Sequence, residues 1–189
     1  MLEYLNSIDN YVALLDSDTL QALESVSQTR VYAKGDYLLR EGETCKNSYL
    51  IEQGVARKYY INNGKEFTTE LYFDNDLAVV FDSYVLQTPG KEYIEVLSPV
   101  RVVATNFDAY KLLKQSHPKL AVLDLMMTEY YAMWLEQRLF DFHTLDAAAR
   151  YQKLLQKQPH IIKNIPLTIV ASYLGISLET LSRIRARIS

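Results

Sequence analysis

Cysteine and histidine are scarce in this chain of 189 residues, and their scarcity excludes several kinds of site. The single cysteine, Cys45, cannot form an internal disulfide, and it cannot hold an iron–sulfur cluster or a cysteine-rich zinc site within one chain. The three histidines are scattered, and no P-loop, G-x-S-x-G or H-E-x-x-H motif accompanies them. We therefore expect no metal site and no catalytic site, and an enzyme is the least favoured function.

Long hydrophobic runs are also missing. The longest uninterrupted apolar stretch, residues 130–135, is far shorter than the roughly 20 residues that a membrane-spanning helix needs. The first ten residues, M-L-E-Y-L-N-S-I-D-N, are acidic and lack the basic start and apolar centre of a signal peptide. Hydrophobic residues nevertheless make up 49% of the chain, which is enough for a substantial core. We expect a soluble cytoplasmic protein without a membrane partner.

Positive charge is scarce over most of the chain and concentrated at its end. The whole chain has 20 Lys and Arg against 23 Asp and Glu, a net charge of −3. Residues 150–189 hold seven of the basic residues and one acidic residue, so this stretch carries +6 and the remainder −9. A basic end on an acidic body is typical of a protein that touches phosphates with one part only.

The basic end also has the pattern of a helix-turn-helix between residues 166 and 189. Pro166 suits the first turn of a helix, and Gly175 supplies the left-handed backbone position that ends it. Ser177 is an N-cap residue type, so a second helix can begin there. One small residue and three apolar residues at helical spacing would close the wedge between the two helices: Ala171, Val170, Leu181 and Ile184.

The second of these helices directs a polar face outward. The side chains of this face can donate hydrogen bonds to base edges in a DNA groove or accept hydrogen bonds from them: Glu179, Thr180, Ser182, Arg183 and Arg187. The alternative is an ordinary helical hairpin packed inside a domain. That alternative would direct Arg183, Arg185 and Arg187 at the protein's own core, where arginine is seldom fully buried.

The part of the chain before residue 106 changes from helical to strand patterning. Residues 2–27 have two apolar helical stripes separated by a break at residues 16–18. Residues 29–105 alternate and are punctuated by glycine, with a hairpin turn at residues 62–64. Seven or eight short strands of this kind predict a closed antiparallel barrel or a jelly roll. The strands are expected at residues 31–33, 37–40, 48–52, 55–61, 66–73, 93–97 and 101–105.

A long helix is predicted from Pro118 to about Asp141, on the order of 35 Å in length. Four of its apolar residues recur at spacings of three and four, as in a coiled-coil seam: Leu123, Met127, Tyr130 and Trp134. We expect one apolar face to pack on the barrel and another on the same helix of a second subunit; a helix buried along one face of a monomer is the alternative. Residues 141–144 are the candidate hinge, and Thr144 is the expected cap of the helix that follows.

This order of elements resembles the Crp/Fnr family of bacterial transcription regulators over essentially the full chain. The motifs that carry the resemblance are G-D-Y-L-L-R-E-G-E (35–43), Y-L-I-E-Q-G-V-A-R (49–57), R-Y-Q-K-L-L (150–155), I-P-L-T-I-V-A-S-Y-L-G-I-S (165–177) and L-E-T-L-S-R-I-R (178–185). The resemblance implies an α+β fold: an N-terminal antiparallel β-barrel or jelly roll of the cyclic-nucleotide-binding type, a long dimerisation helix, and a C-terminal winged-helix or helix-turn-helix domain. The resemblance thus implies three regions: an effector domain at residues 1–117, the long dimerisation helix with the hinge at 118–142, and the helix-turn-helix DNA-binding domain at 143–189.

In that family a Glu and, four positions later, an Arg on the recognition helix read base edges, and these positions match Glu179 and Arg183 here. Their chemistry agrees, because a carboxylate accepts from cytosine N4 and an Arg binds guanine O6 and N7 as a fork. The preceding residue is Leu178, where the family's best-known member has another Arg, so the preferred half-site stays open. Contacts to the DNA backbone are assigned to Ser177, Thr180, Ser182, Arg185 and Arg187.

The barrel departs from the cyclic-AMP binders of that family. Those proteins carry a Gly-Glu pair on a short helix and then an Arg-Ser/Thr-Ala segment, whereas this chain reads N-D-L-A-V-V-F-D-S-Y (75–84) and P-G-K-E-Y-I-E-V-L (89–97). Lys91 could offer positive charge there, but without the bidentate geometry of Arg. Cyclic AMP is therefore not expected as the effector, and a degenerate pocket, a different small molecule and no effector all stay open. The candidate pocket residues are Tyr84, Lys91, Tyr93 and Tyr130.

Two functions are compatible with these patterns. The first is a homodimeric, sequence-specific regulator that binds double-stranded DNA, with RNA polymerase as a further candidate partner. The second is a small-molecule sensor barrel whose output is a protein contact, with the terminal helices as an interaction module. A salt titration of binding to random duplex separates them, because only basic DNA contacts give a steep log–log slope.

Overall fold

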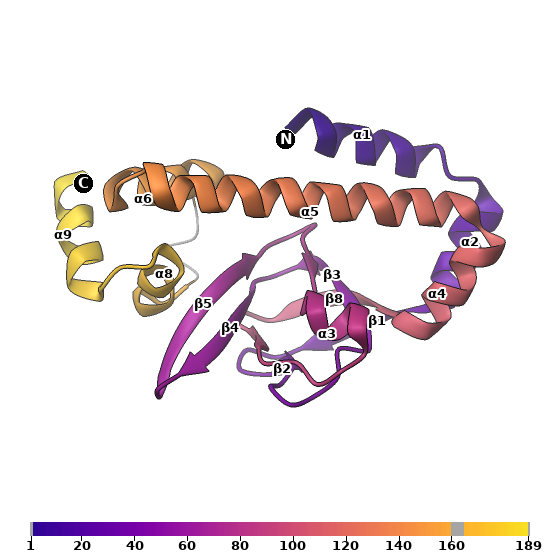
Figure 1. Ribbon diagram of the computed structural model, residues 1–189, viewed down its shortest axis with the longest axis horizontal. Helices are drawn as coiled ribbons and strands as arrows, with labels where there is room; N and C mark the ends of the chain where they lie inside the picture. The colour runs from indigo at the N-terminus through magenta and orange to yellow at the C-terminus, as the bar shows by residue number, and fades with distance from the viewer. Residues whose placement is uncertain (1, 160–164, 189) are drawn as a thin grey trace. The chain divides into compact units, whose positions relative to one another are not determined.

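The computed structural model describes residues 2–159 and 165–188 (Figure 1). The contacts within the chain divide it into two units. The first unit combines Met1–Gln28 with Thr105–Leu145, and the second combines Thr29–Ala104 with Asp146–Ser189. Each unit is therefore built from two segments that are far apart in the sequence, and the helix-turn-helix segment belongs to the same unit as most of the strands.

The first unit is helical. Asp16 begins the second helix by accepting a hydrogen bond from the backbone N–H of Thr19 at 2.8 Å, and Asn106 caps the third helix by accepting from Ala109 at 3.1 Å. Caps of this kind satisfy the N–H groups that the first turn of a helix leaves unpaired. The four helices are α1 (Leu2–Ala13), α2 (Ser17–Ser25), α4 (Phe107–Ser116) and α5 (Pro118–Thr144).

Helix α1 lies along α5 (Figure 1). The Tyr4 hydroxyl donates to the Glu129 carboxylate, and the Tyr11 hydroxyl donates to the Lys119 carbonyl at 3.2 Å. The Lys119 ammonium also forms an ion pair with Asp16, with Nζ and Oδ2 2.6 Å apart. One face of α5 is therefore covered by the chain's own N-terminal residues.

Helix α5 continues beyond the predicted end near Asp141 and ends at Thr144. The prediction that Thr144 caps the next helix is wrong. Its hydroxyl donates to the Phe140 carbonyl at 2.8 Å inside α5, as Ser and Thr often do within a helix. Asp146 is the cap instead, because its carboxylate accepts from the N–H of Ala149 at 2.8 Å.

Strands among the described residues form two four-stranded sheets. The strand order is β1-β8-β3-β6 in one sheet and β2-β7-β4-β5 in the other. This is the order of a double-sheet jelly roll, so that prediction is confirmed and the closed barrel is wrong. The strands are β1 (Ser27–Tyr32), β2 (Tyr37–Leu39), β3 (Asn47–Gln53), β4 (Ala56–Asn62), β5 (Lys65–Tyr72), β6 (Leu77–Ala78), β7 (Tyr93–Val96) and β8 (Val100–Asn106), and the short helix α3 (Phe81–Leu86) follows β6.

The core of the jelly roll follows the two-residue period of its strands. Ile94 and Val96 on β7, and Val100, Val102 and Ala104 on β8, are almost inaccessible to solvent, whereas the residues between them are more exposed. Successive side chains of a strand point to opposite faces of its sheet. The alternating apolar residues therefore line the space between the two sheets.

Strands β4 and β5 form a hairpin at one edge of the second sheet. Asn62 pairs with Lys65 at its closed end, and Asn63 and Gly64 make the turn with φ values of 51° and 75°. Two positive φ values are what a two-residue hairpin turn requires, so the turn predicted at residues 62–64 is confirmed. Since β5 has no further neighbour in the strand order, its outer side is an edge that no other strand pairs with.

Three helices complete the second unit: α6 (Ala147–Lys157), α8 (Leu167–Leu174) and α9 (Leu178–Ile188). Their apolar core also includes Val55, Leu71 and Leu97 of the jelly roll. Among the described residues that follow Leu145, the regular elements are these helices, which agrees with a helical C-terminal domain.

Candidate nucleic-acid interface

Helices α8 and α9 meet at a tight turn centred on Gly175. Gly175 has a φ of 67°, the left-handed value that ends a helix, and its N–H donates to the Ser172 carbonyl at 3.0 Å. The N–H of Ile176 donates to the Ala171 carbonyl at 3.0 Å, so two backbone hydrogen bonds close the last turn of α8. The buried side chains of the two helices are Val170, Ala171, Leu174, Leu181 and Ile184.

Helix α6 packs against α8 and fixes its C-terminal end. Tyr151 on α6 is only 2% exposed and belongs to the same apolar cluster as Leu181. Arg150 donates from Nη2 to the Leu174 carbonyl at 3.2 Å. A cation at this end of a helix is favourable, because carbonyl groups without helical partners gather there.

Ser177 begins α9 as its spacing predicted. Its Oγ accepts the N–H of Thr180 at 3.2 Å, which is the hydrogen bond of an N-cap residue. The Ser177 hydroxyl in turn donates to Thr180 Oγ1 at 3.2 Å, and Arg183 Nη2 donates to the same atom at 3.2 Å. The first turn of α9 therefore orients the Arg183 guanidinium.

Most of the residues predicted to contact DNA lie on one side of α9 and its cap, whereas Arg185, two residues from Arg183, lies on another face of the helix. The exposed ones are Ser177, Glu179, Ser182, Arg183 and Arg187, and the half-buried ones are Thr180 and Arg185. Its own backbone N–H, the nearby Ser177 side chain and the charge of Arg183 lower the pKa of Glu179. The Glu179 carboxylate is therefore ionised at neutral pH and acts only as an acceptor. One helical turn away, Arg183 offers a planar set of donors.

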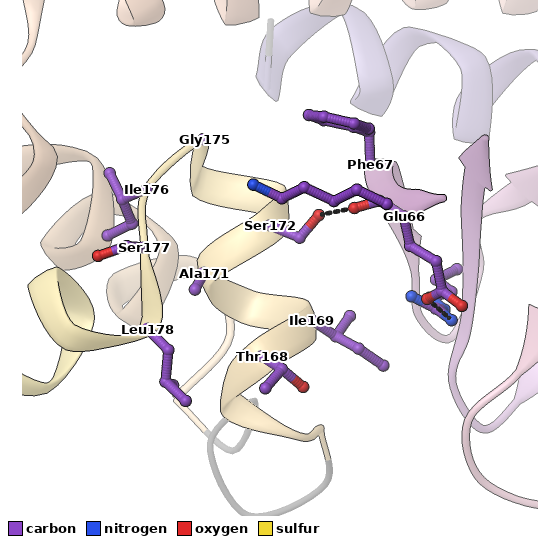
Figure 2. A pocket seen from close by; sticks show the side chains of 12 residues that line it. Glu66, Phe67, Thr168, Ile169, Ala171, Ser172, Gly175, Ile176, Ser177 and Leu178 are labelled. Atoms are coloured by element: carbon purple, nitrogen blue, oxygen red, sulfur yellow. Dashed lines mark hydrogen bonds and ion pairs between the residues drawn. The ribbon is translucent and has the colours of Figure 1, made fainter. Parts of the chain in front are cut away.

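A cavity of about 560 Å³ separates the β4–β5 hairpin from the α8–α9 turn (Figure 2). Lys65 and Phe67 line it on the hairpin side, and Ser177 and Leu178 line it on the helix side. The Ser172 hydroxyl bridges the two sides by direct hydrogen bonds to the backbone of β5. The sequence did not predict this contact, because its partners are about a hundred residues apart and no local pattern links them.

Two curated proteins are similar to the chain in sequence. The anaerobic regulatory protein of Haemophilus influenzae is 26% identical over 192 aligned positions, which span 92% of this chain and 72% of that protein. The cAMP-dependent protein kinase regulatory subunit of Candida albicans is 33% identical over 105 positions, which span 54% of this chain but only 21% of that protein. No model of a known protein family matches the chain.

Solved structures of bacterial regulators share the arrangement of elements. FixK2 from Bradyrhizobium japonicum superposes with a TM-score of 0.72 at 17% identity, over 86% of this chain and 84% of that one. The c-di-GMP responsive global regulator CLP of Xanthomonas campestris superposes with a TM-score of 0.68 at 13% identity, over 92% and 91%. The chain has the Crp/Fnr fold. The resemblance inferred from the sequence motifs is thereby confirmed at the level of the fold.

Within this Crp/Fnr fold, the four candidate effector residues make different contacts. Tyr84 packs against the jelly-roll core. Tyr93 stacks on Tyr59, with ring centroids 4.9 Å apart. Lys91 is exposed, and Tyr130 is half-buried on α5, which belongs to the other unit.

A charge network that the sequence did not predict is buried in the jelly roll of the Crp/Fnr fold. Lys58 is only 4% exposed, and its ammonium pairs with the Glu70 carboxylate and lies 3.9 Å from that of Glu92. Lys58 also donates to the Val79 carbonyl at 3.4 Å, and Thr69 Oγ1 donates to Glu92 at 3.1 Å. Burial raises the pKa of Glu92, because a carboxylate loses solvation there.

These residues do not fit the phosphate of a cyclic nucleotide. The buried cation, Lys58, is already neutralised by carboxylates. The segment after α3 is closed on itself, because Ser83 Oγ donates to the Thr88 carbonyl at 2.5 Å and accepts the N–H of Cys45 at 2.9 Å. A Cβ added at Gly90 would lie 3.2 Å from the Ser83 side chain, which is tighter than ordinary contact. Lys58 is thus already paired with carboxylates, and the segment around Ser83 is held by its own hydrogen bonds.

Across residues 2–159 and 165–188, no three or more His, Cys, Asp and Glu side chains gather in a way that could hold a metal ion. No helix in that same part of the chain is both long enough and apolar enough to cross a bilayer.

Proposed function

We propose that this chain is a sequence-specific DNA-binding transcriptional regulator of the Crp/Fnr type, acting as a dimer in the cytoplasm. The observation that carries the proposal is the exposed side of α9, where Glu179 and Arg183 stand one helical turn apart on a helix held by a closed turn. Two of the similar proteins, the anaerobic regulatory protein and the global regulator CLP, are regulators by name, which supports the same role here.

The chemistry of the two residues suits the edges of a C·G base pair. A carboxylate such as that of Glu179 accepts from cytosine N4, and a guanidinium such as that of Arg183 binds guanine O6 and N7 together. In a helix-turn-helix, the second helix lies in the major groove with its N-terminal residues at the bases. Contacts that position the protein on phosphates are assigned to Ser177, Thr180, Ser182, Arg185 and Arg187.

The second copy is proposed to pack along an exposed row of α5. The residues of this row are all exposed and alternate at spacings of four and three: Ala121, Leu125, Thr128, Ala132, Leu135, Leu139 and Phe142. That alternation is the a/d pattern of a coiled coil. The row predicted from the sequence is half-buried within the single chain: Leu123, Met127, Tyr130 and Trp134. We therefore assign the seam to the exposed row, which lies on another face of the helix.

The jelly roll is proposed to act without a cyclic nucleotide. The neutralised Lys58 and the closed segment around Ser83 support this. Adding cyclic AMP or cyclic GMP should leave the melting temperature unchanged, because a ligand that binds only the folded state would raise it. A concentration-dependent rise would contradict the proposal. A contact with RNA polymerase stays a prediction from the resemblance.

Arg183→Ala tests the base-reading assignment. A target is first selected from a random duplex pool with the parent protein, and affinities for the target and for random duplex are then compared. We expect Arg183→Ala to lose about 1–3 kcal/mol of discrimination at one base pair, because each bidentate contact contributes about that much. Arg101→Ala, on the jelly roll and paired with Glu52, is the matched control and should behave as the parent does.

Two outcomes would reject the proposed function. If Arg183→Ala binds target and random duplex as the parent does, Arg183 does not read bases. If the parent shows no sequence preference and little dependence on salt, the protein-contact output expected as the alternative would replace DNA binding, because phosphate contacts release counterions and give a steep salt dependence.

A further inference from the structure

The β4–β5 hairpin is attached to the helix-turn-helix through a side chain. Ser172 on α8 accepts a hydrogen bond from the N–H of Thr68 at 2.9 Å and donates to the carbonyl of Glu66 at 3.2 Å (Figure 2). Both partners are backbone groups of β5, which is an edge strand of its sheet. Leu71 of β5 also belongs to the apolar cluster that contains Val170 of α8. The hairpin and the first helix of the helix-turn-helix therefore form one continuous surface.

The closed end of this hairpin lies beside the start of α9. Lys65, the first residue of β5, lines the same cavity as Ser177 and Leu178, which begin α9. Asn63 and Gly64 close this end with a tight two-residue turn. In a helix-turn-helix bound to DNA, the first helix crosses the backbone while the second enters the groove. An element beside the junction of these two helices is therefore close to phosphates.

The charges at this end of the hairpin favour an anion. The Glu66 carboxylate is held by Arg57 Nη2 at 2.6 Å, and Arg57 also donates from Nε to Glu95 at 2.7 Å. Arg57 thus offsets part of the negative charge of Glu66, because it shares its own charge with Glu95. Lys65 is exposed, and its Nζ lies 5.3 Å from the ring centroid of Phe67. Within the part of the chain that the structure describes, Lys65 has no carboxylate partner.

From these relations we infer that the β4–β5 hairpin is part of the DNA-contacting surface and that Lys65 binds a backbone phosphate. The inference rests on the proposed function and extends it to a residue outside the helix-turn-helix. A lysine gives a point-charge contact to phosphate and carries no base information. Lys65 therefore adds affinity for any duplex and leaves selectivity unchanged. Ser172 is a positioning residue, because it fixes the hairpin against α8.

The test is a salt titration of Lys65→Gln on the selected target and on random duplex. Each phosphate contact contributes about 0.9 to the slope of log K against log salt, so the slope should fall by about that amount on both duplexes. The ratio of the two affinities should stay at the parent value. Lys34→Gln, at an exposed lysine in the turn before β2, is the matched control and should keep the parent slope. A parent-like slope for Lys65→Gln overturns the inference, as does a changed affinity ratio.

Ser172→Ala tests the attachment of the hairpin. Removal of the hydroxyl should speed hydrogen exchange at the Thr68 amide, which then has only water to bond on the open edge. The slope change caused by Lys65→Gln should also shrink in the Ser172→Ala background, since residues that act together are not additive. An equal slope change in both backgrounds would show that Ser172 does not position Lys65. The Lys65→Gln titration in the parent background stands even if Ser172→Ala does not fold.

Failure of this inference is distinguishable from failure of the proposed function. If the parent binds its target, Arg183→Ala loses discrimination and Lys65→Gln changes nothing, only the hairpin assignment is wrong. If the parent itself shows no sequence preference and no salt dependence, the proposed DNA-binding function is wrong, whatever Lys65→Gln does.

Discussion

Arg150 donates a hydrogen bond from Nη2 to the main-chain carbonyl of Leu174 at 3.2 Å. The bond joins α6 to the last turn of α8 and brings a full positive charge to the negative end of that helix. Leu174 is only 3% exposed, so water has little access to replace the bond. The orientation of α8, the helix that precedes α9, therefore depends on a residue in the first turn of α6.

Arg150→Met should lower the free energy of unfolding by about 2 kcal/mol, because hydrogen bonds to charged groups contribute about 1.5–3 kcal/mol. Arg150→Lys should recover part of the loss, since a lysine keeps the charge but not the planar donors. Urea unfolding monitored by circular dichroism measures both. Gln152→Met, at an exposed position of the same helix, is the control and should stay near the parent. Equal losses for Arg150→Met and Gln152→Met would mean that the bond to Leu174 adds nothing.

The two carboxylates near Lys58 should respond differently to substitution. Glu70→Gln should lower the free energy of unfolding by about 3 kcal/mol, because it leaves a buried ammonium without its closest counter-charge. Glu92→Gln should be neutral or slightly stabilising at pH 7, because an amide can still accept from Thr69 and needs less solvation than a buried carboxylate. Urea unfolding of the two variants at pH 7 measures the difference. An equal decrease in the free energy of unfolding for Glu70→Gln and Glu92→Gln would contradict the different roles assigned to the two carboxylates.

The raised pKa of Glu92 also predicts the sign of a pH effect. The folded protein binds this proton more tightly than the unfolded chain does, so the associated stability is present below the ordinary pKa of 4.5 and is lost as the pH rises through the folded value. Glu92→Gln should remove that part of the dependence. The free energy of unfolding, measured from pH 4 to pH 7, should therefore vary less with pH for the variant than for the parent. An unchanged pH dependence would show that Glu92 is not the group responsible.

Ser177→Ala should lower stability by about 1 kcal/mol, because it removes the N-cap of α9. The same change should raise the pKa of Glu179, which the Ser177 hydroxyl helps to keep low. An NMR titration of the glutamate carboxyl signals measures this shift. Ser182→Ala, on the exposed side of the same helix, should change neither quantity. If the pKa of Glu179 stays the same in Ser177→Ala, the Ser177 hydroxyl is not one of its partners in solution.

Leu135→Glu should convert the proposed dimer to a monomer, because it places a charge in the middle of the exposed row of α5. Sedimentation equilibrium measures the change in mass. Leu112→Glu on α4, where the side chain is 65% exposed, is the control and should leave the mass unchanged. Should Met127→Glu break the dimer while Leu135→Glu does not, the half-buried row predicted from the sequence would be the seam.

Features that depend on a few neighbouring residues were predictable. Asp16 and Asn106 cap helices whose first turns follow directly, and Asn63 and Gly64 turn the hairpin that their types favour. Gly175 likewise adopts the left-handed conformation expected of it. Each of these effects acts within three or four residues of its origin, so the sequence alone carries it.

Features that depend on tertiary neighbours were not predictable. Two rows of α5 share the same three-and-four spacing, and only the packing of α1 and α4 on this helix distinguishes the exposed row from the half-buried one. Helix α3 was missed because it is short and Val80 before it provides no side-chain cap. The pairing of Lys58 with Glu70 required the β4–β5 register, although the two-residue period already places Lys58 on the same face as buried Ala56.

The attachment of α8 to β5 has a second consequence, for solubility. An open strand edge with unsatisfied N–H and C=O groups recruits strands from other molecules, and proteins often cover such edges with a helix. Ser172 occupies the N–H of Thr68 and the carbonyl of Glu66 on that edge. A chain truncated before α8 would leave these groups open to intermolecular β-pairing. Ser172 thus leaves two fewer unpaired backbone groups on this edge for a strand of another molecule to bind.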